Sequence, residues 1–106
     1  QIAPEKNEAG LSKEERDKRM ARMFHAAGAG DARIPMGRHP SMHRTDSVDY
    51  IILLRGEVTA LLDVGEVKMK PFDVLIQRGT NHGWVNYGEE PALLVAVLVD
   101  AEPLPR

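Results

Sequence analysis

Two spacings of apolar residues divide the chain. From Lys13 to about Phe24, good helix formers surround an apolar stripe at helical spacing, which predicts a helix that packs on the rest of the domain or on a second subunit. Ser12 precedes this stretch and Glu15 follows three positions later, the spacing of a capping box. Residues 1–10 are polar and predict a loose arm, and residues 26–30 are expected to end the helix. The stripe consists of Met20, Met23 and Phe24.

From Ile34 onward, short apolar runs separated by turn residues replace the helical period. Such a rhythm predicts an antiparallel sandwich or barrel. The run at 66–70 alternates strictly and predicts one solvent-facing side, whereas the run at 92–99 does not alternate and is expected to be covered on both faces. The expected strands are Val48–Leu54, Val58–Leu62, Glu66–Lys70, Val74–Ile76, one that His82 opens, and Ala92–Val99.

Composition limits the class of protein. The chain has 106 residues, 42% hydrophobic and 28% charged, which is typical of one soluble globular domain. We expect an arm and helix over 1–30 and a barrel over 31–106. The net charge of −2 provides no basic footprint, so no nucleic-acid partner is expected. The longest apolar run is far shorter than the roughly 20 residues of a membrane helix, and no secretory pattern is present. A cytoplasmic protein without a membrane partner is therefore expected.

The absence of cysteine excludes disulfides, thiolate zinc sites and cysteine nucleophiles. Any metal must be bound through nitrogen and oxygen. Of the four histidines, His25 lies at the helix end, where a cation complements the helix dipole, and the others lie near expected strand ends. His39 is a lesser candidate ligand.

Side chains two positions apart share one face of a strand. His43, Thr45, Ser47 and Asp49 would therefore look the same way, ahead of Ile51 and Leu53. A polar cluster above an apolar floor is how a barrel pocket is commonly built. Tyr50 would point to the opposite face, toward another sheet or a partner subunit.

A second stretch, residues 72–86, carries an apolar strand into a glycine-containing turn, after which His82 opens the next strand. Gln77, Trp84 and Asn86 flank His82 and are candidate pocket residues together with Thr45. Trp84 is expected either to close the pocket mouth or to pack in the core. Arg44 and Arg78 are candidate partners of a substrate carboxylate, with a plain surface role as the alternative.

Together these stretches resemble the cupin superfamily. Its first motif, G-x5-H-x-H-x3,4-E-x6-G, corresponds to Gly37, His43, Thr45, Asp49 and Gly56. Its second motif, G-x5-P-x-G-x2-H-x3-N, corresponds in part to Gly79, His82 and Asn86, with Gln77 at the proline position. The resemblance implies a cupin double-stranded β-helix, a jelly-roll-like all-β barrel, here with an N-terminal helical arm, and it covers residues 37 to about 100.

The departures from the motifs limit what the resemblance implies. Thr45 stands where metal-binding cupins have a second histidine, Asp49 replaces the glutamate, and Phe72 replaces a glycine before Asp73 in a turn one residue shorter. What remains is a set of two imidazoles and one carboxylate, His43, Asp49 and His82. Such a set suits Fe(II), with Mn, Ni or Zn as alternatives.

Three functions follow as hypotheses. The first is a metal-assisted decarboxylase, lyase or dioxygenase acting on a small carbonyl or carboxylate compound. The second is a metal-free cupin that binds or senses a small ligand, which the missing second histidine favours. The third is an assembly role through strand edges and the helix. A homodimer is expected in each case, and the sequence does not identify a catalytic residue.

Overall fold

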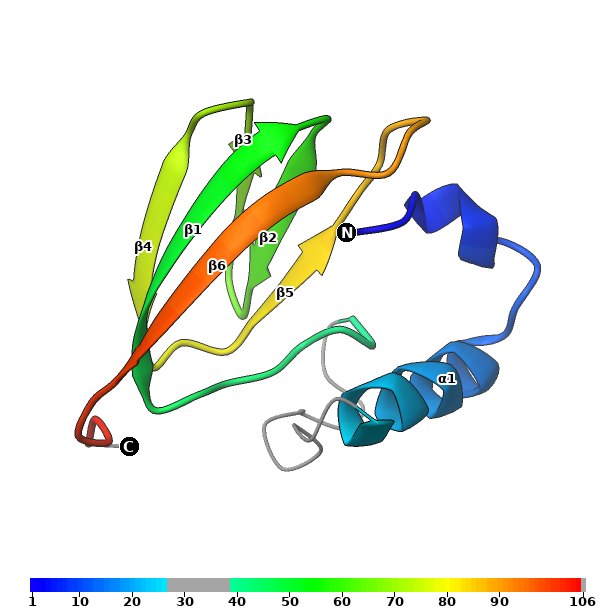
Figure 1. Ribbon diagram of the computed structural model, residues 1–106. Coiled ribbons are helices and arrows are strands. Elements are labelled where there is room, and N and C mark those ends of the chain that lie inside the picture. Colours follow the sequence, from blue (N-terminus) through cyan, green and yellow to red (C-terminus); the bar gives the residue numbers. More distant parts are fainter. Residues whose placement is uncertain (27–38, 106) are drawn as a thin grey trace.

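The computed structural model describes residues 1–26 and 39–105. Their strands form two three-stranded antiparallel sheets, ordered β4-β1-β6 and β3-β2-β5, which lie as two layers in Figure 1. The all-β, jelly-roll-like fold with an N-terminal helix is confirmed. The elements are η1 (Glu5–Glu8), α1 (Lys13–Ala26), β1 (Ser47–Arg55), β2 (Val58–Leu62), β3 (Glu66–Met69), β4 (Val74–Arg78), β5 (His82–Val85) and β6 (Leu93–Asp100).

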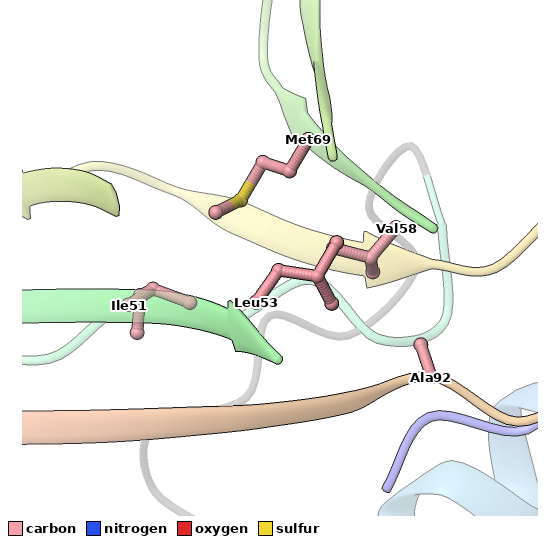
Figure 2. Packing of buried hydrophobic residues seen from close by; sticks show 5 residues of the cluster. All are labelled: Ile51, Leu53, Val58, Met69 and Ala92. Atoms are coloured by element: carbon pink, nitrogen blue, oxygen red, sulfur yellow. The ribbon is translucent and has the colours of Figure 1, made fainter. Parts of the chain in front are cut away.

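The core lies between the two sheets. In β1, alternate residues are buried, so Ile51 and Leu53 face the other sheet while Tyr50 points outward. Figure 2 shows Ile51 and Leu53 with Val58 and Met69 of the facing sheet and with Ala92, which directly precedes β6. The inner face of β1 continues from these apolar residues to the buried Asp49 and Ser47. The expected polar end above an apolar floor is therefore present on this strand.

The expectation that residues 92–99 are covered on both faces is wrong. β6 pairs with β1 and forms the edge of its sheet, and every residue from Val95 to Asp100 is exposed. The run lacks alternation because both of its faces carry apolar side chains, not because both are buried. The strand at 66–69 also departs from simple alternation, since only Met69 is buried there.

The outer face of the β4-β1-β6 sheet is apolar and open in the described part of the chain. Tyr50 lies opposite Ile76 on one side and Val97 on the other, and Ile52 lies opposite Val74 and Val95. Five of these side chains are between 40% and 62% exposed. We call this surface the outer face; it comprises Val48, Tyr50, Ile52, Val74, Ile76, Val95, Val97 and Val99.

The polarity of the N-terminal arm predicted a loose segment, but this prediction is wrong, because the arm is hydrogen-bonded to the barrel. Ile2 exchanges two backbone hydrogen bonds of 2.9 Å with Ala92, and the Glu5 amide donates to the Asn86 carbonyl at 2.6 Å. These bonds add the arm to the barrel and place η1 beside the end of β5 (Figure 1). Polarity of side chains gave no sign of pairing that uses only the backbone.

The helix begins where the sequence predicts. The Glu15 amide donates to Ser12 Oγ at 3.1 Å, which satisfies one of the free amides of the first turn. No side chain of α1 is fully buried, however, and Met23 is 62% exposed. The apolar stripe therefore borders space that protein atoms do not fill. The end of the helix in residues 26–30 and the start of the barrel domain at 31 fall largely outside the described residues.

The turn between β3 and β4 places Phe72 in an unfavourable backbone conformation. Its φ is 72°, the only positive φ at a non-glycine residue in the described chain. Left-handed backbone costs roughly 1–2 kcal/mol for a residue with a Cβ. The motif glycines Gly56 and Gly79 adopt the same region with φ of 84° and 63° and have no such cost. The departure from glycine at Phe72 therefore leaves local strain.

We expect Phe72→Gly to raise the free energy of unfolding by about 1 kcal/mol, because the side chain is 78% exposed and loses little packing. For a domain of this size, the midpoint temperature should rise by roughly 4–8 °C in thermal denaturation. Phe72→Ala is the matched control, since it removes the same ring and keeps the strain. Equal stability of the glycine and alanine variants would contradict this account.

Candidate functional site

The two motif histidines meet through their backbones. The His43 amide donates to the His82 carbonyl at 2.7 Å, and the His82 amide donates to the His43 carbonyl at 2.9 Å. Residues paired in this way across an antiparallel bridge place their side chains on the same side. The ring centroids are accordingly 4.1 Å apart, in an edge-on arrangement. Segments separated by 39 residues in sequence thus supply adjacent imidazoles.

This pairing needs a glycine next to His82. A Cβ at Gly83 would lie 2.6 Å from Ser41 Oγ and 3.1 Å from Met42 Sδ, both on the segment that leads to His43. Gly83 and Ser41 are buried, and Met42 packs with Leu61 and Val85 in a second apolar cluster. The absence of a side chain at position 83 therefore lets the His43 segment approach β5 closely enough to pair.

Hydrogen bonds fix the proton of each ring. His43 Nδ1 donates to the Ser41 carbonyl at 2.7 Å, and His82 Nδ1 donates to the Thr80 carbonyl at 2.8 Å. Since a carbonyl oxygen can only accept, both Nδ1 atoms carry hydrogen, which leaves the lone pair of a neutral ring on Nε2. A backbone carbonyl on the second nitrogen is the usual way in which a metal-binding histidine is oriented.

Burial keeps both rings neutral. Burial lowers the pKa of His43, although its hydrogen bond to Ser41 and the charge of Asp49 act in the opposite direction. Burial and the neighbouring His43 lower the pKa of His82, opposed by Thr80 and Asp49. Neutral imidazole is the form that binds metals and accepts protons.

Asp49 lies in the same pocket, and both of its oxygens have partners. Ser47 Oγ donates to Oδ1 at 2.5 Å, and Gln77 Nε2 donates to Oδ2 at 3.1 Å. Thr45 and Ser47 share a further hydrogen bond of 2.7 Å between their hydroxyls. The carbonyl oxygen of Gln77 is buried and unpartnered. Among the described residues, the chain Thr45–Ser47–Asp49–Gln77 therefore ends in a buried acceptor that has no partner.

These groups line a cavity of about 200 Å³, which we call the histidine pocket. Its lining combines polar side chains with apolar side chains of β1 and β6, and Leu98 lies directly beside Asp49 in the register of these two strands. That combination is typical of a small-molecule site. Its lining residues are Phe24, His43, Thr45, Asp49, Ile51, Gln77, His82, Trp84, Ala96 and Leu98.

The remaining sequence candidates occupy different positions. Trp84 is half-buried beside His82, with ring centroids 5.7 Å apart, and borders the histidine pocket. Asn86 is 1% exposed, and its amide binds the Ile2 and Glu90 carbonyls and the Gly88 amide, so it anchors the arm and a turn. It does not line the histidine pocket.

The other histidines and arginines lie away from the pair. His39 Nδ1 accepts from the Ser41 amide and its Nε2 lies 2.9 Å from Glu5 Oε2, so both ring nitrogens are engaged elsewhere. His25 is exposed at the end of α1. Arg78 donates to the Glu102 carbonyl, and Arg44 borders a separate cavity. None of these four lines the histidine pocket.

Over residues 1–26 and 39–105, no group of three or more His, Asp or Glu side chains is arranged to hold a metal ion. The donor chemistry fits a metal at two positions, the Nε2 atoms of His43 and His82. The third predicted ligand, Asp49, lies in the pocket with its oxygens hydrogen-bonded. The three-ligand set therefore stays a prediction.

Sequence reasoning did not identify four residues of the site, which are Phe24, Ser47, Ala96 and Leu98. Phe24, from the apolar stripe of α1, lies with its ring 5.2 Å from that of His43 and closes the pocket on the helix side. Ser47 was placed on the right face but was not expected to bind Asp49. No signal in the sequence distinguishes a stripe that covers a pocket from one that joins the core.

Comparison with known proteins identifies the family. A family model described as a cupin domain matches residues 30–98, and the chain belongs to this family. Three fungal relatives are similar over 67 to 70 residues, and the chain spans 34% to 39% of their length. They are phomopsin biosynthesis cluster protein D of Diaporthe leptostromiformis (43% identical, 64% of this chain), oryzines biosynthesis cluster protein J of Aspergillus oryzae (39%, 64%) and the cupin-domain-containing oxidoreductase virC of Hypocrea virens (40%, 59%).

The described helices include none that is both long and apolar enough to span a bilayer.

We expect the chelator-treated protein to lose stability below about pH 6.5. Unfolding returns both histidines to an ordinary pKa of 6.5, so the unfolded chain binds more protons below that pH. The free energy of unfolding should be fully developed above this value and decline as the pH falls toward the lower native pKa values. Urea denaturation between about pH 5 and pH 8 measures this.

His43→Gln and His82→Gln should each flatten the decline, whereas His25→Gln, at the exposed end of α1, should leave it unchanged. A decline that persists undiminished in both pocket variants would show that other groups cause it.

Proposed function

We propose that this cupin domain is the site of a small-molecule enzyme, with His43 and His82 holding a divalent metal and Asp49 as third ligand. The observation that carries the proposal is the pair of neutral imidazoles, 4.1 Å apart, with both Nδ1 protons bound to backbone carbonyls. Two Nε2 lone pairs are thereby available in one pocket. Nitrogen and oxygen donors suit Fe, Mn, Ni or Zn.

When bound, such a metal would supply Lewis-acid or oxygen-activating chemistry to a small carbonyl or carboxylate compound. The resemblance admits decarboxylase, lyase and dioxygenase reactions. Several relatives carry the name cupin-domain-containing oxidoreductase, which favours the redox branch. The apolar side chains of Ile51, Ala96 and Leu98 would pack against the apolar part of the bound substrate. Gln77 would orient it by accepting a hydrogen bond at the buried carbonyl oxygen.

A metal-free binding module is the second candidate, and the state of Asp49 favours it. Both carboxylate oxygens already accept hydrogen bonds, so a metal would have to replace Ser47 or Gln77 as a partner. In this version, the histidine pocket would hold a small ligand by the same polar and apolar side chains, without chemistry. The two candidates differ in the consequence of removing Asp49.

We expect protein purified without chelator to contain about one divalent metal ion per chain by elemental analysis. His82→Ala and Asp49→Ala should each lower the metal affinity at least tenfold, because each removes a ligand. Metal addition should also raise the melting temperature of the stripped wild-type protein. His25→Ala is the matched control, since this imidazole is exposed and remote from the pocket.

A protein that contains no metal, and whose melting temperature ignores added Fe, Mn, Ni and Zn, would exclude the metalloenzyme. Unchanged small-ligand binding by Asp49→Ala would then support the binding module.

We further propose that a second copy of the chain covers the outer face. Apart from Arg78, which lies opposite Val48 at one end, this face is uncharged, follows matching registers on three strands and leaves large apolar side chains exposed. A typical monomer exposes its apolar residues singly, whereas on the outer face they are contiguous. Two identical flat apolar faces suit packing about a two-fold axis, with sheets about 10 Å apart.

We expect a dimer by sedimentation equilibrium at micromolar concentration. Ile76→Lys and Val97→Lys should each shift the protein toward monomer, because each buries a charge in the proposed interface. Val64→Lys is the control, since Val64 is 90% exposed and lies outside this face. A monomeric wild-type protein would contradict the proposal.

A further inference from the structure

A second cavity adjoins the histidine pocket on the side of α1. It has a volume of about 250 Å³ and shares Phe24, His43 and Trp84 with the histidine pocket. These three side chains form the boundary between the two spaces, and the Phe24 ring lies 5.2 Å from that of His43. We call this cavity the helix-side chamber; its apolar lining comprises Ile2, Pro4, Met20, Met23, Phe24 and Val85.

Polar contacts, rather than apolar packing, hold the wall of the chamber in place. Arg16 donates to Glu5 at 2.6 Å, His39 Nε2 lies 2.9 Å from the same carboxylate, and Arg19 donates to Glu8 at 3.1 Å. These bonds tie α1 to η1 and to the segment that leads to His43. An amphipathic helix ordinarily buries its apolar face, but here Met20 and Phe24 are half-buried and Met23 is exposed. The apolar stripe therefore faces space that protein atoms do not fill.

Most polar groups of the chamber already have partners. Glu5 binds Arg16 and His39, and Ser41 binds His39 and the Trp84 carbonyl. Although burial raises the pKa of Glu5, hydrogen bonds from Arg16 and His39 more than offset this and lower it overall. The charge of Glu5 is thus compensated by its own partners. Apart from Gln1 and the Nε2 lone pair of His43, the surfaces that remain for a ligand are apolar.

We propose that the ligand has two parts, a polar head at His43 and His82 and an apolar tail that passes Phe24 and Trp84 into the helix-side chamber. The inference rests on the proposed function for the head and on the chamber for the tail. An engineered cavity of roughly 150 Å³ holds benzene, so a chamber of about 250 Å³ accommodates a tail larger than one aromatic ring. The apolar side chains that line the chamber gain contacts when such a group enters.

The test is a series of phenols of one head and increasing tail: phenol, then its 4-ethyl, 4-butyl and 4-hexyl derivatives, whose hydroxyl can donate to the Nε2 lone pair of His43 or His82. Dissociation constants are measured by calorimetry on the protein as purified. Each methylene that enters the chamber should tighten binding about threefold to fourfold, until the chamber is full.

Met20→Trp should flatten the series, because the larger side chain occupies the chamber, while phenol itself keeps its affinity. Met23→Trp provides a second filling variant whose residue is exposed and whose folding is not at risk. Val64→Trp, an equally large change at an exposed position outside the chamber, should leave the series unchanged. A flat series in the wild-type protein, the same rise in both filling variants, or no binding by any of the phenols would overturn the inference.

Failure of the chamber and failure of the metal centre are distinguishable. Tail-dependent affinity in a protein without metal would support the chamber and contradict the metalloenzyme. Metal-dependent binding of phenol with no effect of the tail would do the reverse. His82→Ala separates the two directly, since it should weaken every phenol by the same factor and leave the ratio between 4-hexylphenol and phenol unchanged.

Discussion

The pairing of His43 with His82 is the contact on which the site depends. Two backbone hydrogen bonds join the segment before β1 to the start of β5. Because β1 and β5 belong to different sheets, these bonds connect the two sheets. The same bonds put both imidazoles on one side of the backbone. Because Gly83 has no side chain, Ser41 and Met42 approach β5 closely. The backbone pairing of His43 with His82 therefore both connects the sheets and places the two imidazoles.

The electrostatics of the site follow from that pairing. Each ring is buried and gives its Nδ1 proton to a carbonyl two residues earlier, Ser41 or Thr80. Those carbonyls are positioned by the backbone alone, so the orientation of the rings does not depend on any other side chain. Asp49 is positioned differently, by Ser47 and Gln77. The nitrogen donors are thus prearranged for a ligand, whereas the carboxylate is arranged within its own network.

The sequence predicted what depends on local pattern. Alternation along β1 placed Ser47 and Asp49 on the inner face with Ile51 and Leu53, and motif spacing brought His43 and His82 into one hypothesis. Pairing that uses only backbone atoms left no such trace, so the arm at Ile2 was expected to be loose. The exposure of β6 was missed because an unbroken apolar run is the same for a covered strand and an uncovered edge. Which partner takes the oxygens of Asp49 depends on tertiary distances that residue order does not contain.

The position of the site reflects how the N-terminal elements are attached. The arm is joined by backbone pairing at Ile2 and by Asn86, and α1 by the cluster of Glu5, Arg16 and His39. Directional polar bonds can hold two elements at a fixed separation, whereas apolar packing draws them together until the space is filled. Attachment by polar bonds therefore allows apolar surface on Met20 and Phe24 to remain beside the barrel without collapsing onto it. The cavity next to the histidines therefore lies between α1 and the barrel and not in the packed interior. The whole chain has only five aromatic residues.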